Sequence, residues 1–295
     1  MTDPKAGAPV NFRAEVAEYD RLADVRKLDG ARHRMTFRLL GEGPLLVLLP
    51  GLASTYRGYA PTLLRLADRF QTVQLDYPAE HTDDGAHLAS IGHGHLVEDL
   101  FHLLDHLGLA TACPFGLSFG STIALEALRR DPGRFPRAAL QGGFARRGLQ
   151  PAERLALALG RNIRGSASRL PFHKLGLARN NRPTFPADRP DVWDFYAEEN
   201  GRTPLASLTH RLDLLGRLDL RPTLAAVGTE TLVIHGTADR IVPMRSHHEL
   251  AAGLPRATVA LMPGVGHQPH WTHPVELARL VSDFLGGGEG PSVGA

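Results

Sequence analysis

Cysteine is scarce in this sequence, because the 295 residues contain only one, Cys113. A single cysteine cannot form a disulfide within the chain, which excludes a disulfide-stapled scaffold and favours a reducing compartment. Long apolar runs are also absent. The run LLVLL ends at Pro50 and Gly51, far short of the ~18 residues that span a bilayer. The N-terminus lacks the basic and then apolar segments of a secretory signal. We therefore expect a cytoplasmic protein without a membrane partner, in which Cys113 is a buried strand residue.

Charge of one sign is not in excess either. The sequence has 33 basic and 31 acidic residues and a formal charge of +2, which argues against a nucleic-acid partner. No repeat with a period of ~20 to 50 residues is present, so solenoids and propellers are excluded. Hydrophobic residues make up 43% of the chain, enough for a substantial core. We expect a globular protein that acts on a small molecule, and composition leaves its oligomeric state open.

Apolar runs typical of buried strands alternate with stretches of helical periodicity along most of the chain. A hairpin is predicted first, with its turn at Asp29-Gly30. The alternation that follows predicts a mostly parallel central sheet flanked by helices, which is the α/β class. Strands are predicted at 25–28, 34–40, 45–50, 72–78, 110–116, 137–143, 231–236 and 258–264, and helices near 59–70, 95–109, 121–130, 246–254 and 274–285.

The alternation stops between Phe144 and Ala226, where helix-like pieces are separated by proline and glycine. We interpret this stretch as a helical cap inserted into the sheet domain. The two ends of the chain are poor in apolar residues and are expected to be disordered. The predicted organisation is therefore a core of residues 1–143 and 227–295, with 1–10 and 286–295 disordered, and a cap of residues 144–226.

Two features of the insertion allow more than one interpretation. Ten basic residues, nine arginines and Lys174, lie between Arg146 and Arg189, against two acidic residues. They could steer anionic substrates or simply cover solvated helix faces. The aromatic residues of the insertion are interpreted as packing inside the cap rather than lining a pocket. The four aromatic residues interpreted in this way are Phe172, Trp193, Phe195 and Tyr196.

The segment Gly116-Leu117-Ser118-Phe119-Gly120 fits G-x-S-x-G and lies between a predicted strand and a predicted helix. Small residues two places before and two places after the serine allow the sharp turn of a nucleophile elbow. That turn exposes the hydroxyl, and it directs the positive end of the helix dipole at the reacting centre. The alternative is a glycine-rich loop in which serine only caps the helix.

A catalytic serine needs a base, normally histidine, and a carboxylate that orients it. The chain has 15 histidines, so position decides between them. Asp239 follows the predicted strand 231–236, and His267 follows the next predicted strand. Among the other histidines, His235 is interpreted as a packed strand residue, and the pair His247 and His248 as part of a solvated helix surface.

These motifs together resemble the α/β-hydrolase superfamily. The matching pieces are LLPGLAST, GLSFGS, HGTADRIVP and GVGHQPHWTHP, and the resemblance extends from about Leu28 to Leu285. It implies the α/β-hydrolase fold, with Ser118 as the nucleophile, His267 as the general base and later acid, and Asp239 fixing the imidazole tautomer.

The resemblance also implies an oxyanion hole made by the backbone N–H groups of Leu52 and Phe119. Leu117 and Trp271 are the positions expected to contact substrate. Neither a cofactor nor a metal is expected, since no zinc-ligand pattern accompanies His267. The chain departs from the family after QLDYP, where the common Gly-x-Gly-x-Ser segment is missing, and at Leu117, where many members have a polar residue.

A serine at the elbow predicts acyl transfer, and the leading expectation is hydrolysis of a carboxylic ester of small or medium size. The main alternative is a C–C bond hydrolase of aromatic ring-fission products. The segment GHQPHWTHP, with Trp271 four residues after His267, resembles those enzymes. Thioesterase, lactonase and perhydrolase activities fit the same three residues. A binding protein of the same fold without catalytic activity also stays open.

Overall fold

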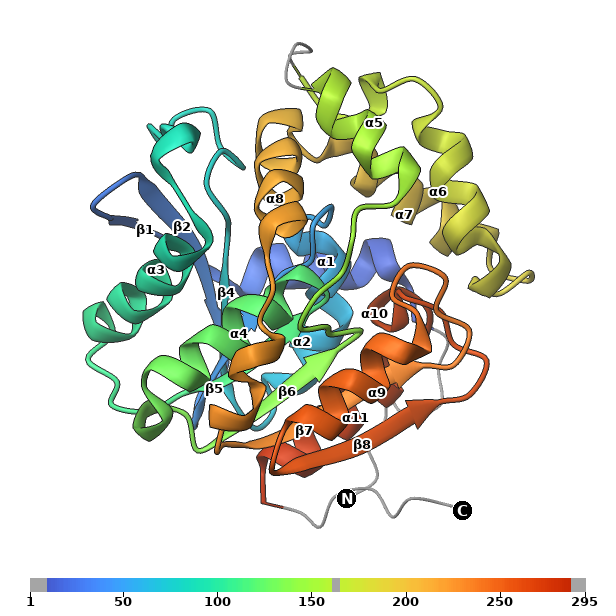
Figure 1. Ribbon diagram of the computed structural model, residues 1–295. Helices are drawn as coiled ribbons and strands as arrows, with labels where there is room; N and C mark the ends of the chain where they lie inside the picture. The colour runs from blue at the N-terminus through green and yellow to red at the C-terminus, as the bar shows by residue number, and fades with distance from the viewer. Residues whose placement is uncertain (1–9, 161–164, 288–295) are drawn as a thin grey trace.

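The computed structural model describes residues 10–160 and 165–287, so the predictions for residues 1–9 and 288–295 lie outside the described residues. Its centre is an eight-stranded sheet with the order β1-β2-β4-β3-β5-β6-β7-β8 (Figure 1). β2 pairs antiparallel with β1 and with β4, and every other pairing is parallel. The predicted α/β class is confirmed. The strands are β1 (Asp24–Asp29), β2 (Arg34–Leu40), β3 (Leu45–Leu49), β4 (Gln71–Leu75), β5 (Cys113–Leu117), β6 (Arg137–Gln141), β7 (Glu230–Gly236) and β8 (Ala257–Met262).

Helices cover both faces of the sheet, and β3 shows why its sequence reads as a continuous apolar run. All five of its residues are buried. Leu45, Val47 and Leu49 belong to the core on one face, whereas Leu46 and Leu48 belong to the core on the other, because successive side chains of a strand point to opposite faces. The covering helices are α3 (His93–His106), α4 (Phe119–Arg130) and α9 (Met244–Gly253) on the first face, and α1 (Phe12–Leu22), α2 (Ala60–Leu66) and α11 (Pro274–Leu285) on the second.

Helix α1 was not predicted from the sequence, although its signals are present. The Asn11 side chain accepts a hydrogen bond from the N–H of Ala14, which is an N-cap. Phe12, Val16 and Tyr19 form its buried face at helical spacing. The helix therefore adds an apolar layer beside α2.

The insertion between β6 and β7 contains helices α5 (Pro151–Gly160), α6 (His173–Asn181), α7 (Pro190–Arg202) and α8 (Leu205–Arg217). In Figure 1 these helices lie together above one edge of the sheet. Within the described part of residues 144–226, the β-structure consists of one isolated bridge between Ser166 and Pro204. The division of the chain into a core and a separate cap stays a prediction.

One histidine prediction was wrong. His247 is 2% exposed and its ring stacks on that of His235, with ring centroids 5.1 Å apart. The face of helix α9 that contains His247 packs against β7, so His247 is buried while the neighbouring His248 is exposed.

Candidate active site

Ser118 lies at the sharp turn between β5 and α4. Its backbone has φ 50° and ψ −114°, a left-handed conformation that is uncommon for a residue with a Cβ and that stores strain. The N–H of Ser118 donates to the carbonyl of Gln141 on β6, at 2.8 Å, which helps to hold the turn. The residue is 8% exposed, and its hydroxyl stands at the carboxyl edge of the sheet.

The two glycines of the motif are required by close contacts. A Cβ added to Gly120 would lie 2.0 Å from the carbonyl oxygen of Leu49, and one added to Gly116 would lie 2.7 Å from Cα of Ser121. Helix α4 thus begins in direct contact with the end of β3. The spacing of two residues on each side of the serine follows from how tightly the turn packs.

The structure brings Ser118, His267 and Asp239 together from three separate strand ends. Nε2 of His267 lies 3.0 Å from Oγ of Ser118, and Nδ1 lies 2.6 Å from Oδ2 of Asp239. The second carboxylate oxygen, Oδ1, accepts the N–H groups of Ile241 and Val242 at 2.8 and 2.9 Å. The imidazole is therefore held between a fixed carboxylate and a hydroxyl.

The carboxylate stays charged despite its burial. Burial acts to raise the pKa of Asp239, but the charge and hydrogen bond of His267, with the two backbone N–H groups, outweigh it and leave the pKa below its usual value.

The neighbouring His270 is uncharged. Burial, followed by the charge of His267, lowers the pKa of His270 to about 3, so His270 stays neutral and is a poor candidate for the base.

The two segments predicted to form an oxyanion hole flank Ser118. Phe119 is the first residue of α4, where backbone N–H groups lack acceptors within the helix. A Cβ on Gly51 would lie 3.6 Å from Cβ of Ser118, so the loop after β3 that contains Leu52 passes directly beside the serine. The donor roles of Leu52 and Phe119 stay predictions.

A cavity of about 650 Å³ opens beside Ser118 and His267. Leu117 lines it, whereas Trp271 is absent from its described lining residues. Trp271 instead is 4% exposed and stacks on Phe12 of α1 at 4.9 Å, so its position favours a packing role over the predicted contact with substrate. The apolar walls come mainly from the insertion, through Leu155, Leu159, Leu170, Leu175, Leu208 and Leu212.

The aromatic residues of the insertion divide between core and surface. Phe195 and Tyr196 are buried, at 4% and 2% exposed, as predicted for packing inside the cap, although Tyr196 also lines the cavity. Phe172 is 74% exposed and lines the cavity, so its predicted place in the cap interior was wrong. Trp193 is partly buried and packs edge-on against Phe185.

Several arginines of the insertion are paired with carboxylates. Arg147 binds Glu153 at 2.7 Å and Arg189 binds Asp191 at 2.9 Å, which reduces the positive charge available to a ligand. Arg179 lines the cavity. Two further arginines, at 161 and 164, lie outside the described residues, and steering of anionic substrates stays a prediction.

Two other properties bear on the class of protein. Across residues 10–160 and 165–287, no three histidine, cysteine, aspartate or glutamate residues are grouped so that they could hold a metal ion. None of the helices described there is long and apolar enough to cross a membrane.

The sheet order, the elbow and the cluster around Ser118 define an α/β hydrolase, and the comparisons with known proteins agree. The chain belongs to the Hydrolase_4 family, described as serine aminopeptidase, S33, whose family model matches residues 43–272. It is a hydrolase enzyme with an esterase-type activity, in agreement with its relatives in sequence.

Two relatives resemble this chain in sequence, and two solved structures resemble it in fold. A pimeloyl-[acyl-carrier protein] methyl ester esterase of Xanthomonas campestris pv. campestris is 31% identical over 280 residues, covering 85% of this chain and 98% of the relative. A 2-hydroxymuconate semialdehyde hydrolase of Pseudomonas putida is 30% identical over 203 residues, covering 64% and 67%. The fold matches an enol-lactonase of Burkholderia xenovorans LB400, with a TM-score of 0.77, 22% identity and coverage of 88% and 100%. It also matches a thermophilic esterase of Thermogutta terrifontis, with a TM-score of 0.74, 19% identity and coverage of 89% and 98%.

Proposed function

We propose that this enzyme hydrolyses carboxylic esters of small or medium size through Ser118, His267 and Asp239. The observation that carries the proposal is the distance of 3.0 Å between the serine Oγ and the imidazole Nε2. With the proton of the ring on Nδ1, facing Asp239 at 2.6 Å, Nε2 is free to accept the hydroxyl proton. The ionised carboxylate then stabilises the imidazolium that forms.

The reaction proceeds in two halves. Oγ of Ser118 attacks the ester carbonyl as His267 takes its proton, and the imidazolium then protonates the departing alcohol, which leaves an acyl-enzyme. Water, activated by the same imidazole, releases the acid and regenerates the hydroxyl. The N–H groups of Leu52 and Phe119 are proposed to bind the oxyanion of both tetrahedral intermediates, and Phe119 has the N-terminal dipole of α4 behind it.

The cavity supports a substrate with an aliphatic chain. Its walls are dominated by leucines of the insertion, and its volume of about 650 Å³ lies in the usual range for small-molecule sites. A methyl ester esterase among the relatives supports a small alcohol as leaving group. We propose an acyl chain of medium length that lies under the insertion, with the ester at Ser118.

A panel of p-nitrophenyl esters tests this proposal. Activity with butyrate and octanoate should exceed activity with palmitate by about tenfold or more in kcat/KM. The palmitoyl chain is longer than the cavity, so part of it cannot be buried against the cavity wall. Acetate should fall below octanoate. A profile that rises steadily to palmitate would contradict the size limit, and no turnover of any ester would contradict ester hydrolysis itself.

A C–C bond hydrolase is the second candidate, and the 2-hydroxymuconate semialdehyde hydrolase among the relatives favours it. The sequence evidence for this candidate was Trp271, and that evidence is weaker because Trp271 stacks on Phe12 and does not line the cavity among the described residues. A ring-fission dienoate in the same panel separates the two candidates. Turnover of the dienoate above that of every ester would replace the proposed function with this one.

The rate should depend on pH through one acidic limb. Since the imidazole must accept a proton, kcat/KM should fall as the medium is acidified from about pH 8 to pH 4, with a limiting slope of one. The lowered pKa of Asp239 keeps the carboxylate ionised over this range, so it adds no second proton to the slope. A rate that stays flat to about pH 4 would exclude a histidine base.

A further inference from the structure

The peptide group that joins Pro50 to Gly51 is held at both ends by tyrosine hydroxyls. The hydroxyl of Tyr77 donates to the carbonyl oxygen of Pro50 at 2.8 Å. The N–H of Gly51 donates to the hydroxyl oxygen of Tyr59 at 3.0 Å. The next peptide group along the chain, Gly51–Leu52, contains the N–H of Leu52, which is one of the two proposed oxyanion donors.

Both hydroxyls are fixed in place and stay neutral. Tyr77 and Tyr59 are 4% and 0% exposed, and burial raises the pKa of each phenol. The ring of Tyr59 stacks on His270 at 4.6 Å. The ring of Tyr77 packs edge-on against Phe119 at 5.7 Å, so Tyr77 contacts the residue that carries the second proposed donor as well.

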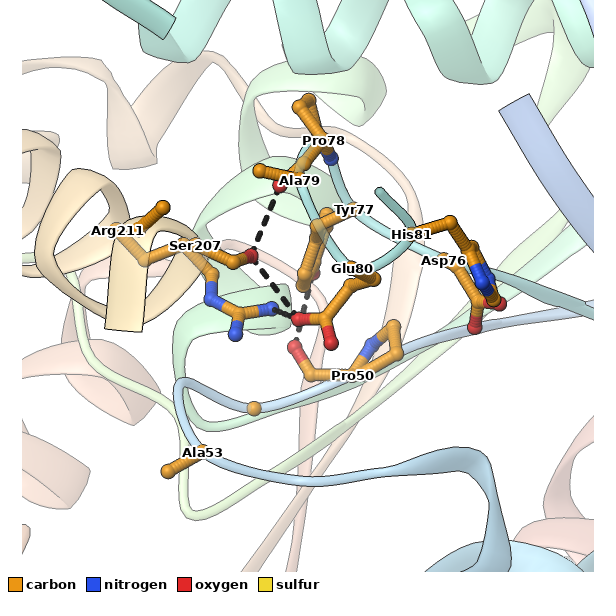
Figure 2. Close-up of polar contacts among 12 residues, drawn as sticks. Pro50, Ala53, Asp76, Tyr77, Pro78, Ala79, Glu80, His81, Ser207 and Arg211 are labelled. Atoms are coloured by element: carbon orange, nitrogen blue, oxygen red, sulfur yellow. Dashed lines mark hydrogen bonds and ion pairs between the residues drawn. The ribbon is translucent and has the colours of Figure 1, made fainter. Parts of the chain in front are cut away.

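Helix α8 of the insertion contacts the segment that contains Tyr77 (Figure 2). The single hydroxyl proton of Ser207 on α8 is shared between two acceptors, the carbonyl oxygen of Pro78 at 2.9 Å and Oε1 of Glu80 at 3.0 Å. Arg211, one turn further along α8, pairs with the same carboxylate of Glu80 at 2.6 Å, and its guanidinium lies over the Tyr77 ring at 5.1 Å. Arg211 is 1% exposed. Helix α8 therefore holds the segment from Tyr77 to Glu80 in one position.

The other side of Leu52 is anchored from α7. Nδ2 of Asn200 donates to the carbonyl oxygen of Ala53 at 2.9 Å. Gly51 has no Cβ and would allow the following N–H to take many directions. With one peptide fixed before Leu52 and another fixed after it, the direction of the Leu52 N–H is restricted.

We propose that Tyr77 is a positioning residue for the oxyanion hole, paired with Tyr59 on the same peptide group and supported by helix α8. This inference rests on the proposed ester hydrolysis. Among the described residues that line the cavity, Tyr59 is present but Tyr77 is not, so Tyr77 acts through the backbone rather than by touching the substrate. The effect is electrostatic, because a donor stabilises the oxyanion only when it points at the place where charge develops.

The test is Tyr77→Phe, with Tyr19→Phe as the matched control. Tyr19 is also buried, at 1% exposed, and its hydroxyl has no hydrogen-bond partner among the described residues. We expect Tyr77→Phe to lower kcat by about tenfold and to leave KM within about twofold. This is less than the loss of a whole donor, because the N–H is misdirected and not removed. Tyr19→Phe should retain the kcat of the unmodified enzyme.

A second measurement separates positioning from a merely structural role. A trifluoromethyl ketone with an octyl chain forms a tetrahedral oxyanion on the serine, whereas octanoate, the product acid, does not. Inhibition by the ketone should weaken by the same factor as kcat falls in Tyr77→Phe, and inhibition by octanoate should be unchanged. Tyr59→Phe should weaken the ketone in the same way and, although Tyr59 lines the cavity, should leave inhibition by octanoate unchanged. With that control it tests the shared peptide group if Tyr77→Phe does not fold.

The possible failures are distinguishable. If Ser118→Ala is inactive but Tyr77→Phe matches Tyr19→Phe in kcat and in ketone inhibition, the positioning role is overturned and ester hydrolysis stands. If kcat falls while ketone inhibition is unchanged, the oxyanion assignment is overturned. If the unmodified enzyme hydrolyses no ester, the proposed function fails first.

Discussion

Replacing Ser118 with alanine should lower kcat by a factor on the order of 10⁴ to 10⁶. The hydroxyl is the atom that forms the acyl-enzyme, and its Oγ lies 3.0 Å from Nε2 of His267. Removing it leaves the imidazole without a nucleophile to activate, so only residual hydrolysis by water remains. Initial rates with p-nitrophenyl butyrate, measured at saturating substrate, provide the comparison.

A matched serine shows that the loss is local. Ser282 lies on α11 and accepts a hydrogen bond from Arg69 at 3.2 Å, so Ser282→Ala removes a hydroxyl of the same kind elsewhere in the chain and should leave kcat unchanged. The thermal unfolding midpoint of Ser118→Ala should stay close to that of the unmodified enzyme. A Ser118→Ala protein within a few-fold of full activity would refute the nucleophile assignment.

Replacing Asp239 with asparagine should lower kcat by roughly 10⁴ while preserving the fold, as in the corresponding substitution of a serine protease. In the unmodified enzyme the N–H groups of Ile241 and Val242 donate to Oδ1 of Asp239. The carbonyl oxygen of asparagine can accept the same two hydrogen bonds. The amide NH₂ would then face Nδ1 of His267 as a donor, favouring the tautomer in which Nε2 carries the proton. In that tautomer the base can no longer accept the proton of Ser118.

Two other aspartates serve as comparisons for the acid. Asp76 binds Arg38 and His81 at 2.6 and 2.9 Å, and Asp213 binds Arg217 at 2.9 Å, whereas Nδ1 of His267 faces Asp239. Asp76→Asn and Asp213→Asn should each reduce kcat far less than Asp239→Asn. If one of them instead caused the largest loss, with Asp239→Asn unaffected, the acid role would move to that residue.

The sequence was sufficient to predict the sheet and the meeting of Ser118, Asp239 and His267. Each of the three follows a predicted strand, and the carboxyl ends of parallel strands meet at one edge of the sheet. The resemblance to the α/β-hydrolase superfamily implied which serine, aspartate and histidine meet there. The buried strands also left a clear pattern, since β3 is apolar at every position. These are local signals whose spatial result is fixed by the class of fold.

Features that depend on packing between distant segments were missed or misplaced. Trp271 lies four residues after His267, yet it points to α1, because Phe12 supplies a stacking partner 4.9 Å away. His247 has polar neighbours in the sequence but is buried against β7. The hydrogen bond from Tyr77 to Pro50 spans 27 residues. Nothing in the spacing of these residues marks the contact, since it exists only after the sheet and the insertion have assembled.

The left-handed backbone at Ser118 has a consequence for how sequences of this family diverge. A residue with a Cβ held at φ 50° costs about 1–3 kcal/mol of folding free energy, and glycine would avoid most of that cost. As long as hydrolysis is under selection, the penalty is tolerated. In descendants that have lost hydrolysis, drift toward glycine at this position should be favoured over drift to alanine, and such a replacement would mark a pseudoenzyme.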